Sequence, residues 1–279
     1  MPGMQPEIPP DPVLEAEYNN RARVPEHPAH LAAWARDAAA WREACPAAEL
    51  GLAYGGRERE RLDLFWPDAS ARESPVALFI HGGYWQGLGR EWASHCARGL
   101  NGLGVAVAVP SYDLCPAVPL AAIVEQMRAA AAMLHRRHGR RLLAMGHSAG
   151  GHLAAMLMAT DWPARDAALP AGLVPAALPI SGVFDLAPLR ATSIGVALAL
   201  DAAEARRLSP LFLPRPAGAL HCVVGAAESA AFLAQGRAMA AAWGGSFATL
   251  PGADHFTVLA PLADPGSAMV RHAKALAPA

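Results

Sequence analysis

"LLAMGHSAGGH", residues Leu142–His152, joins an apolar run to a serine between glycines. Its first four residues are typical of a strand covered on both faces of a sheet. Ser148 then stands between Gly146 and Gly150, and the small and apolar residues that follow are compatible with a helix. A G-x-S-x-G sequence between a strand and a helix is typical of a sharp turn that lifts the serine hydroxyl clear of the backbone. The alternative is a tight turn without chemistry, so a nucleophilic Ser148 requires a base elsewhere in the chain.

Apolar runs of the same kind recur along the chain, separated by segments with helical spacing. The predicted strands cover residues 76–80, 105–109, 142–145, 220–225 and 247–250. A helix is predicted between Ile123 and Leu134 with Gly139 as its C-cap, another after Ser229, and a last one over about 267–276. This alternation predicts an α/β protein with a mostly parallel sheet and helices on both faces. Pro179 conflicts with a further strand in "AALPI", because proline removes a ladder donor.

No internal repeat or linker divides the 279 residues, so we expect one domain. Residues 1–28 are rich in proline and are expected to form an extended N-terminal arm. A helix with Trp34 and Trp41 on its packed face should follow, then a hairpin around Gly55 and Gly56. Residues 185–217 lack strand signals and are interpreted as a cap-like insertion between two strands.

A serine hydroxyl needs a histidine base, and chains with this motif carry the acid and then the histidine downstream of the serine. His81 lies upstream, and His152 should point away from Ser148 within the helix. His221 falls in a strand pattern and His272 in the last helix. His255, in the loop after the last predicted strand, is therefore the predicted base.

The acid that orients the base must follow a strand upstream of His255. Glu228 comes directly after the apolar "LHCVVGAA", and it is preferred over Asp185, which follows "LPISGVF". Asp254 adjoins His255 and is not expected to fold back onto the same ring. Asp185 stays open as the rival, with a turn carboxylate as its alternative role.

"HGGYW", residues 81–85, follows the strand "VALFI" and has glycines that let backbone N–H groups approach a substrate. We expect Gly82, Gly83 and Ala149 to form an oxyanion hole. Tyr84 and Trp85 could flank an aromatic group of the substrate, and packing of the loop is the equal alternative.

Composition excludes several classes of function. A formal net charge of −1 with 17% charged residues leaves no footprint for nucleic acid or an anionic membrane. Four cysteines without CxxC spacing suggest neither a zinc site nor a disulfide framework, and no metal or other cofactor is expected. No apolar run reaches membrane-spanning length, and the N-terminal sequence lacks a signal pattern. We expect a soluble cytoplasmic protein; whether it forms a homodimer stays open.

Taken together, "HGGYW", "GHSAGGH" and "DHF", with a carboxylate between the last two, resemble the kynurenine formamidase (arylformamidase) branch of the α/β-hydrolase superfamily. "YNNRARVPEHP" (residues 18–28) and "SGVFDL" (residues 181–186) are similar to that branch as well. The resemblance implies an α/β-hydrolase fold and a Ser–acid–His enzyme acting on a small acyl substrate. Its acid falls on Glu228, where aspartate is usual in the branch.

The same resemblance implies hydrolysis of N-formyl-L-kynurenine to kynurenine and formate. A general short-chain carboxylesterase or arylesterase is the alternative. A third hypothesis, from another class of function, is a binding protein that has the same fold and no catalytic activity.

Overall fold

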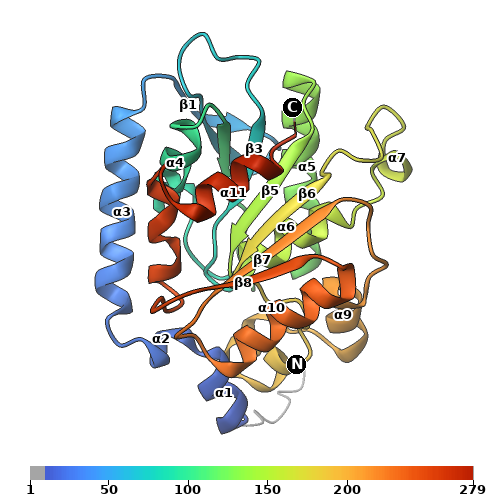
Figure 1. The fold of residues 1–279 in the computed structure, drawn as a ribbon. Coiled ribbons are helices and arrows are strands. Elements are labelled where there is room, and N and C mark those ends of the chain that lie inside the picture. The colour runs from blue at the N-terminus through green and yellow to red at the C-terminus, as the bar shows by residue number, and fades with distance from the viewer. Residues whose placement is uncertain (1–9, 279) are drawn as a thin grey trace.

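The computed structural model describes residues 10–278, and its centre is an eight-stranded sheet in the order β1-β2-β4-β3-β5-β6-β7-β8 (Figure 1). β2 pairs antiparallel with β1 and with β4, and the other neighbours pair in parallel. The strands are β1 (Ala48–Ala53), β2 (Arg61–Phe65), β3 (Val76–Ile80), β4 (Ala106–Pro110), β5 (Leu142–His147), β6 (Ala176–Ile180), β7 (Ala219–Gly225) and β8 (Ser246–Leu250). The predicted hairpin and all the predicted strands are confirmed, with ends moved by one or two residues.

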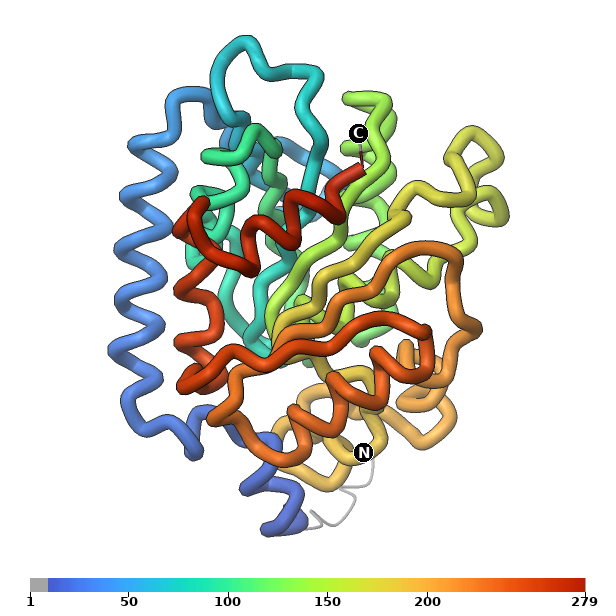
Figure 2. Tube along the Cα trace, in the orientation of Figure 1, coloured from blue at the N-terminus to red at the C-terminus, as the bar shows by residue number. Residues whose placement is uncertain are grey.

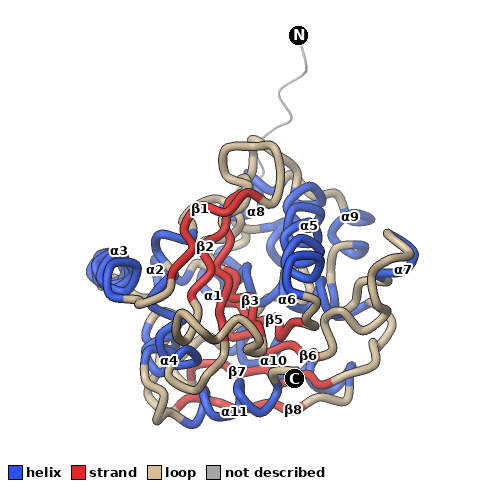
Figure 3. The backbone as a smooth tube through the Cα atoms, turned by 90° about the horizontal axis from the view of Figure 1, so that it is seen from above, coloured by secondary structure: helices blue, strands red, loops and turns tan. Residues whose placement is uncertain are grey.

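Helices cover both faces of the sheet, as an α/β-hydrolase fold requires. α5 (Leu120–His138), α6 (Ala149–Met158) and α10 (Ala230–Trp243) pack into one apolar layer. α3 (His27–Ala44), α4 (Arg98–Asn101) and α11 (Ala268–Leu276) pack into the other. Seen from above, α5 and α4 lie on opposite sides of the strands (Figure 3). Every residue of β3, β4 and β5 is buried, because helices cover both faces of these central strands.

The shorter elements lie around this core. They are α1 (Pro12–Tyr18), α2 (Asn20–Arg23), α7 (Trp162–Arg165), α8 (Ser193–Leu198), α9 (Ala202–Arg207) and the 3-10 turns η1 (Arg90–Trp92), η2 (Ser94–Ala97), η3 (Pro188–Ala191), η4 (Pro210–Phe212) and η5 (Thr257–Ala263). The predicted helix ends are confirmed by their caps. Ser229 Oγ accepts from the N–H of Phe232, and Gly139 ends α5 in a left-handed conformation with φ 66°.

Pro179 lies inside β6 after all. It stands opposite Gly146 of β5, while no pair with β7 is assigned between Ala177 and Ile180. The interruption falls where proline has no N–H to donate. The strand prediction therefore holds in spite of the conflict.

The described part of the predicted extended arm is helical, so that prediction was wrong. Asp11 caps α1, its Oδ1 accepting from the N–H groups of Val13 (2.8 Å) and Leu14 (3.1 Å). Pro12 occupies the first helical position, where its missing N–H costs nothing. Pro12 and Pro28 thus lie in the first turns of α1 and α3 and do not extend the chain. Residues 1–9 of the predicted arm lie outside the described residues.

α1 and α2 lie at the end of the sheet toward which the parallel strands run, and α3 then follows the side of the sheet (Figure 2). α1 packs on the segment between β6 and β7. The N–H of Asp11 donates to the carbonyl of Ala191 (2.8 Å), and that of Ser193 donates to Glu15 Oε2 (2.8 Å). This segment holds η3, α8, α9 and η4 and no strand, as predicted for 185–217.

A buried carboxylate ties the edge of the sheet to its surroundings. The Asp63 side chain on β2 is fully buried, and its Oδ2 lies 2.9 Å from Arg42 Nη1 of α3. Its Oδ1 accepts from Arg90 Nε (3.1 Å) and from the N–H of Gly51 (2.8 Å). Removing one partner of a buried pair leaves the other charges uncompensated.

We therefore expect Asp63→Asn to lower the free energy of unfolding by about 3 kcal/mol in urea titration. Asp37→Asn is the matched control, because its pair with Arg36 is exposed and should contribute less than about 1 kcal/mol. Equal losses in the two variants would contradict the structural role of Asp63.

Burial also makes stability depend on pH through histidines. Desolvation lowers the pKa of His81 to about 3 and the pKa values of His95 and His152 to about 4, and it holds the pKa of His147 well below the usual range. These four rings are neutral in the fold, whereas the unfolded chain takes up protons below about pH 6.5. Unfolding then binds protons, so stability falls as pH falls.

We expect the free energy of unfolding to drop steeply between pH 7 and 4, by up to about 1.4 kcal/mol per pH unit for each of the four histidines. Denaturant titrations at several pH values measure the slope. His95→Gln should lower this slope by the contribution of one histidine, because one proton fewer is bound on unfolding. A flat profile between pH 7 and 5 would contradict the assignment.

Candidate active site

Ser148 lies in a strained turn between β5 and α6, with φ 55° and ψ −116°. A Cβ at Gly146 would collide with the carbonyl of Gly150, and one at Gly150 would collide with the carbonyl of Ile80. Only glycine fits either position, because the backbones of β3, β5 and α6 meet here. Ser148 Oγ is buried and has no hydrogen-bond partner among the described residues.

Glu228 and His255 form a buried hydrogen-bonded pair. His255 Nδ1 donates to Glu228 Oε2 over 2.6 Å, and both side chains are at least 94% buried. Glu228 follows β7 and His255 follows β8, so the carboxyl ends of two neighbouring parallel strands bring them together. The bond fixes the Nδ1–H tautomer of the imidazole and leaves Nε2 free to act as a base.

The second carboxylate oxygen of Glu228 is held as well. Glu228 Oε1 accepts from the N–H of Gly225 (2.7 Å) and from Ser181 Oγ (2.5 Å). Ser181, directly after β6, has φ 50° and was not singled out in the sequence. The signal that could have identified Ser181 is its position at the carboxyl end of a strand that neighbours β7.

The rival residues are engaged elsewhere. Asp185 Oδ1 accepts from the N–H of Ala187 in its own turn, and Asp254 Oδ1 accepts from the N–H of Phe256. His152 Nε2 donates to the carbonyl of Leu208, away from Ser148.

The other two downstream histidines lie together at a distance from this pair. The ring centroids of His221 and His272 are 3.9 Å apart, and His221 Nδ1 bonds to Ser246 Oγ. His221 lies in β7, as its strand pattern predicts, and its side chain is partly exposed.

The loop after β3 lies beside Ser148. A Cβ at Gly82 would stand 3.2 Å from Ser148 Cβ, and Gly83 has φ 101°. Tyr112 OH fixes the loop by donating to the carbonyl of His81 (3.0 Å), and the two rings stack 4.2 Å apart. The N–H groups of Gly82, Gly83 and Ala149 donate to no acceptor among the described residues. Such free donors next to a serine suit a developing negative charge.

Tyr84 and Trp85 lie in different surroundings. Tyr84 lines the cavity at Ser148, and its hydroxyl donates to the carbonyl of Tyr18. Trp85 is fully buried and packs edge-on against His152, with ring centroids 5.1 Å apart. Trp85 does not line the cavity. Of the two alternatives for Trp85, the structure therefore favours packing of the loop over contact with a substrate.

His147 contacts His255 through a hydrogen bond and through its ring. Its Nε2 donates to the backbone carbonyl of His255 (2.8 Å), and the ring centroids are 4.6 Å apart. Because burial keeps His147 neutral, it adds a hydrogen bond without a competing charge.

The cavity at Ser148 is small and is covered by the N-terminal helices. Its volume is about 40 Å³, against the roughly 150 Å³ that accommodates benzene. Asn20 and Arg21 of α2 and Trp34 of α3 line it together with Ser148 and His255. No residue of 185–217, all of them described, belongs to this lining.

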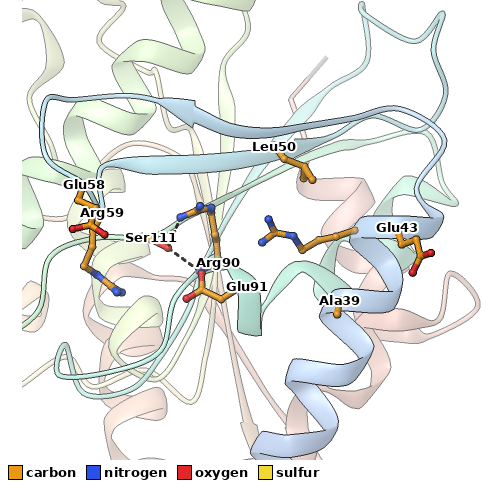
Figure 4. A pocket seen from close by; sticks show the side chains of 9 residues that line it. Ala39, Glu43, Leu50, Glu58, Arg59, Arg90, Glu91 and Ser111 are labelled. Carbon is orange, nitrogen blue, oxygen red and sulfur yellow. Dashed lines mark hydrogen bonds between the residues drawn. The ribbon is translucent and has the colours of Figure 1, made fainter.

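A larger pocket of about 700 Å³ opens near β1, away from Ser148 (Figure 4). Arg90 and Ser111 are hydrogen bonded in it, and Arg59 donates to the carbonyls of Leu88 and Tyr112 (both 2.6 Å). The arginines here hold the structure together, and none of the predicted site residues lines the pocket.

Over residues 10–278, no group of three or more His, Cys, Asp or Glu side chains is arranged to hold a metal ion. Within the same range, no helix combines the length and the apolar character needed to cross a bilayer.

Known proteins similar to this chain agree with the fold. The BD-FAE family model matches residues 62–167. A solved structure from Silicibacter sp., provisionally described as a thioesterase, is 33% identical with a TM-score of 0.86, covering 95% of this chain and 99% of that one. An esterase from the archaeon Pyrobaculum calidifontis has a TM-score of 0.72 at 20% identity, covering 96% and 98% of the two chains. The chain belongs to the α/β-hydrolase family.

Within that family, kynurenine formamidases are similar to part of the chain. Kynurenine formamidase of Salmo salar is 34% identical over 163 residues, 58% of this chain and 54% of that protein. The chain thus aligns with about half the length of the curated relatives it matches.

Proposed function

We propose that this chain is a serine hydrolase that removes a short acyl group from an aryl amide, with N-formylkynurenine as the preferred substrate. The observation that carries the proposal is the Glu228–His255 hydrogen bond of 2.6 Å together with a buried Ser148 Oγ that has no hydrogen-bond partner among the described residues, with Ser148 and His255 lining one cavity. Similarity to kynurenine formamidases supports the choice of substrate.

The proposed first step acylates Ser148. His255 Nε2 takes the hydroxyl proton as Oγ attacks the acyl carbon, and Glu228 stabilises the imidazolium through Nδ1–H. The N–H groups of Gly82, Gly83 and Ala149 bind the oxyanion of the tetrahedral intermediate. The C–N bond then breaks, and His255 returns the proton to the leaving amine.

In the second step water hydrolyses the acyl-enzyme. His255 takes a proton from the water, the new C–O bond forms, and the ester bond to Ser148 breaks as the proton returns to Oγ. With a formyl group the acid released is formate. The cavity of about 40 Å³ supports a short acyl group, because a long chain has no room beside Ser148 without rearrangement.

Variants of the three residues test the mechanism. We expect Ser148→Ala and Glu228→Gln each to lower kcat by at least about 10⁴-fold. The first variant lacks the nucleophile, and the second lacks the carboxylate that stabilises the imidazolium of His255. Asp185→Asn is the matched control and should stay close to the unaltered protein in a spectrophotometric assay. Activity retained by Glu228→Gln and lost in Asp185→Asn would transfer the acid role to Asp185.

A substrate panel tests the specificity. We expect turnover of N-formylkynurenine, and a decline from formyl to acetyl to butyryl in a series of aryl esters, since the cavity limits the acyl group. Turnover of phenyl acetate without N-formylkynurenine would leave a short-chain carboxylesterase, which the esterase neighbours support.

A fluorophosphonate probe should label the protein and spare Ser148→Ala. If the unaltered protein is not labelled, the fold serves binding without catalysis.

A further inference from the structure

We propose that Asn20 and Arg21 of α2 form a subsite that selects anionic amides: Asn20 Oδ1 accepts the N–H of the scissile amide, and Arg21 binds a carboxylate on the leaving group. The inference rests on the proposed function, since it concerns the same cavity. It assigns specificity to a helix that lies far in sequence from Ser148 and His255.

Asn20 is 98% buried and lines the cavity, yet its Oδ1 has no hydrogen-bond partner among the described residues. The orientation of its amide is fixed by neighbours. Tyr84 OH donates to the carbonyl of Tyr18, so it can only accept from Asn20, and Asn20 Nδ2 is the donor (3.3 Å). The carbonyl oxygen of the side chain is therefore left as a buried acceptor, which costs free energy until a donor arrives.

An amide substrate supplies that donor and an ester does not. The N–H of an aryl formamide lies one bond from the acyl carbon that Ser148 attacks, so it falls within the same small cavity. A site with a buried polar group discriminates strongly against an analogue that leaves the group unpaired. Asn20 thus favours amides over esters of the same shape.

Arg21 follows Asn20 in the chain and lines the same cavity with an exposed side chain. Its guanidinium makes no hydrogen bond or ion pair with the residues that the structure describes. The carboxylates of α1 are engaged elsewhere: Glu15 binds Ser193, and Glu17 Oε2 accepts from the N–H of Ala231. A free guanidinium presents a planar fork that matches a carboxylate.

The size of the cavity places the carboxylate at its mouth. With the acyl group beside Ser148, a volume of about 40 Å³ leaves no room for an aromatic ring and its substituents. The leaving group must extend outward past α2, where the exposed Arg21 lies. The substrate class is thus an acylated aryl amine whose amine part carries a carboxylate.

Arg21→Gln tests the anionic part of the proposal. The measured quantity is the ratio of kcat/KM for N-formylkynurenine to that for its carboxamide, which has the same shape without the charge. We expect the ratio to fall about 10- to 100-fold, as for loss of a hydrogen bond to a charged group. Arg23→Gln is the matched control, because Arg23 is an exposed arginine of the same helix outside the cavity lining, and it should keep the ratio. An unchanged ratio in Arg21→Gln overturns the carboxylate subsite.

Asn20→Ala tests the amide part. The ratio of kcat/KM for formanilide to that for phenyl formate should fall about 5- to 10-fold, since only the amide donates to Oδ1. A merely structural role, through Tyr84 and its loop, would lower both substrates together and leave the ratio unchanged. That outcome overturns the assignment of Asn20, and because both substrates are measured on one preparation, partial unfolding does not disturb the ratio.

A second substrate pair separates this proposal from the proposed function. If the protein turns over esters but no formamide, the proposed amidase function fails. The Arg21 effect is then measured on 2-acetoxybenzoate and 2-acetoxybenzamide, and loss of the preference for the acid in Arg21→Gln still supports the carboxylate subsite. No difference between Arg21→Gln and Arg23→Gln on either pair refutes it.

Discussion

The close approach of three backbone segments around Ser148 is the constraint from which the rest of the site follows. Gly150 meets the carbonyl of Ile80, and Ile80 stands opposite Gly146 in the pairing of β3 with β5. The chain leaves both strands at this point, into the loop of Gly82 and into α6. Hydrogen-bond donors and a serine hydroxyl therefore meet because of strand register and not because of any contact between side chains.

The central fold was predictable because its strands are uniformly apolar and the G-x-S-x-G turn tolerates few alternatives. Glu228 and Asp185 could not be separated in the same way, since each follows a strand and the two strands are neighbours. Only the three-dimensional arrangement distinguishes a carboxylate that reaches His255 from one that closes its own turn. Glu228 is held at both oxygens, although the branch that the sequence resembles usually has the shorter aspartate here.

The N-terminal region was misjudged for a physical reason. A proline-rich sequence favours extended chain, whereas Pro12 after Asp11 begins a helix. The residues that cover the cavity, Asn20 and Trp34 among them, line it together with Ser148 although more than a hundred residues of sequence separate them. No local periodicity carries that information, because it arises when the helices dock on the finished sheet.

The hydroxyl of Tyr84 joins the loop after β3 to the N-terminal helices, since it donates to the carbonyl of Tyr18 and accepts from Asn20. The family model that matches residues 62–167 includes Ser148 and its loop but none of α1, α2 or α3. Chemistry and the cover of the cavity are thus encoded in separate stretches of the chain. Substitutions in the first helices can then change which molecules are accepted while the proposed catalytic residues stay unchanged. Within such a lineage, divergence of substrate should therefore be sought ahead of the first strand.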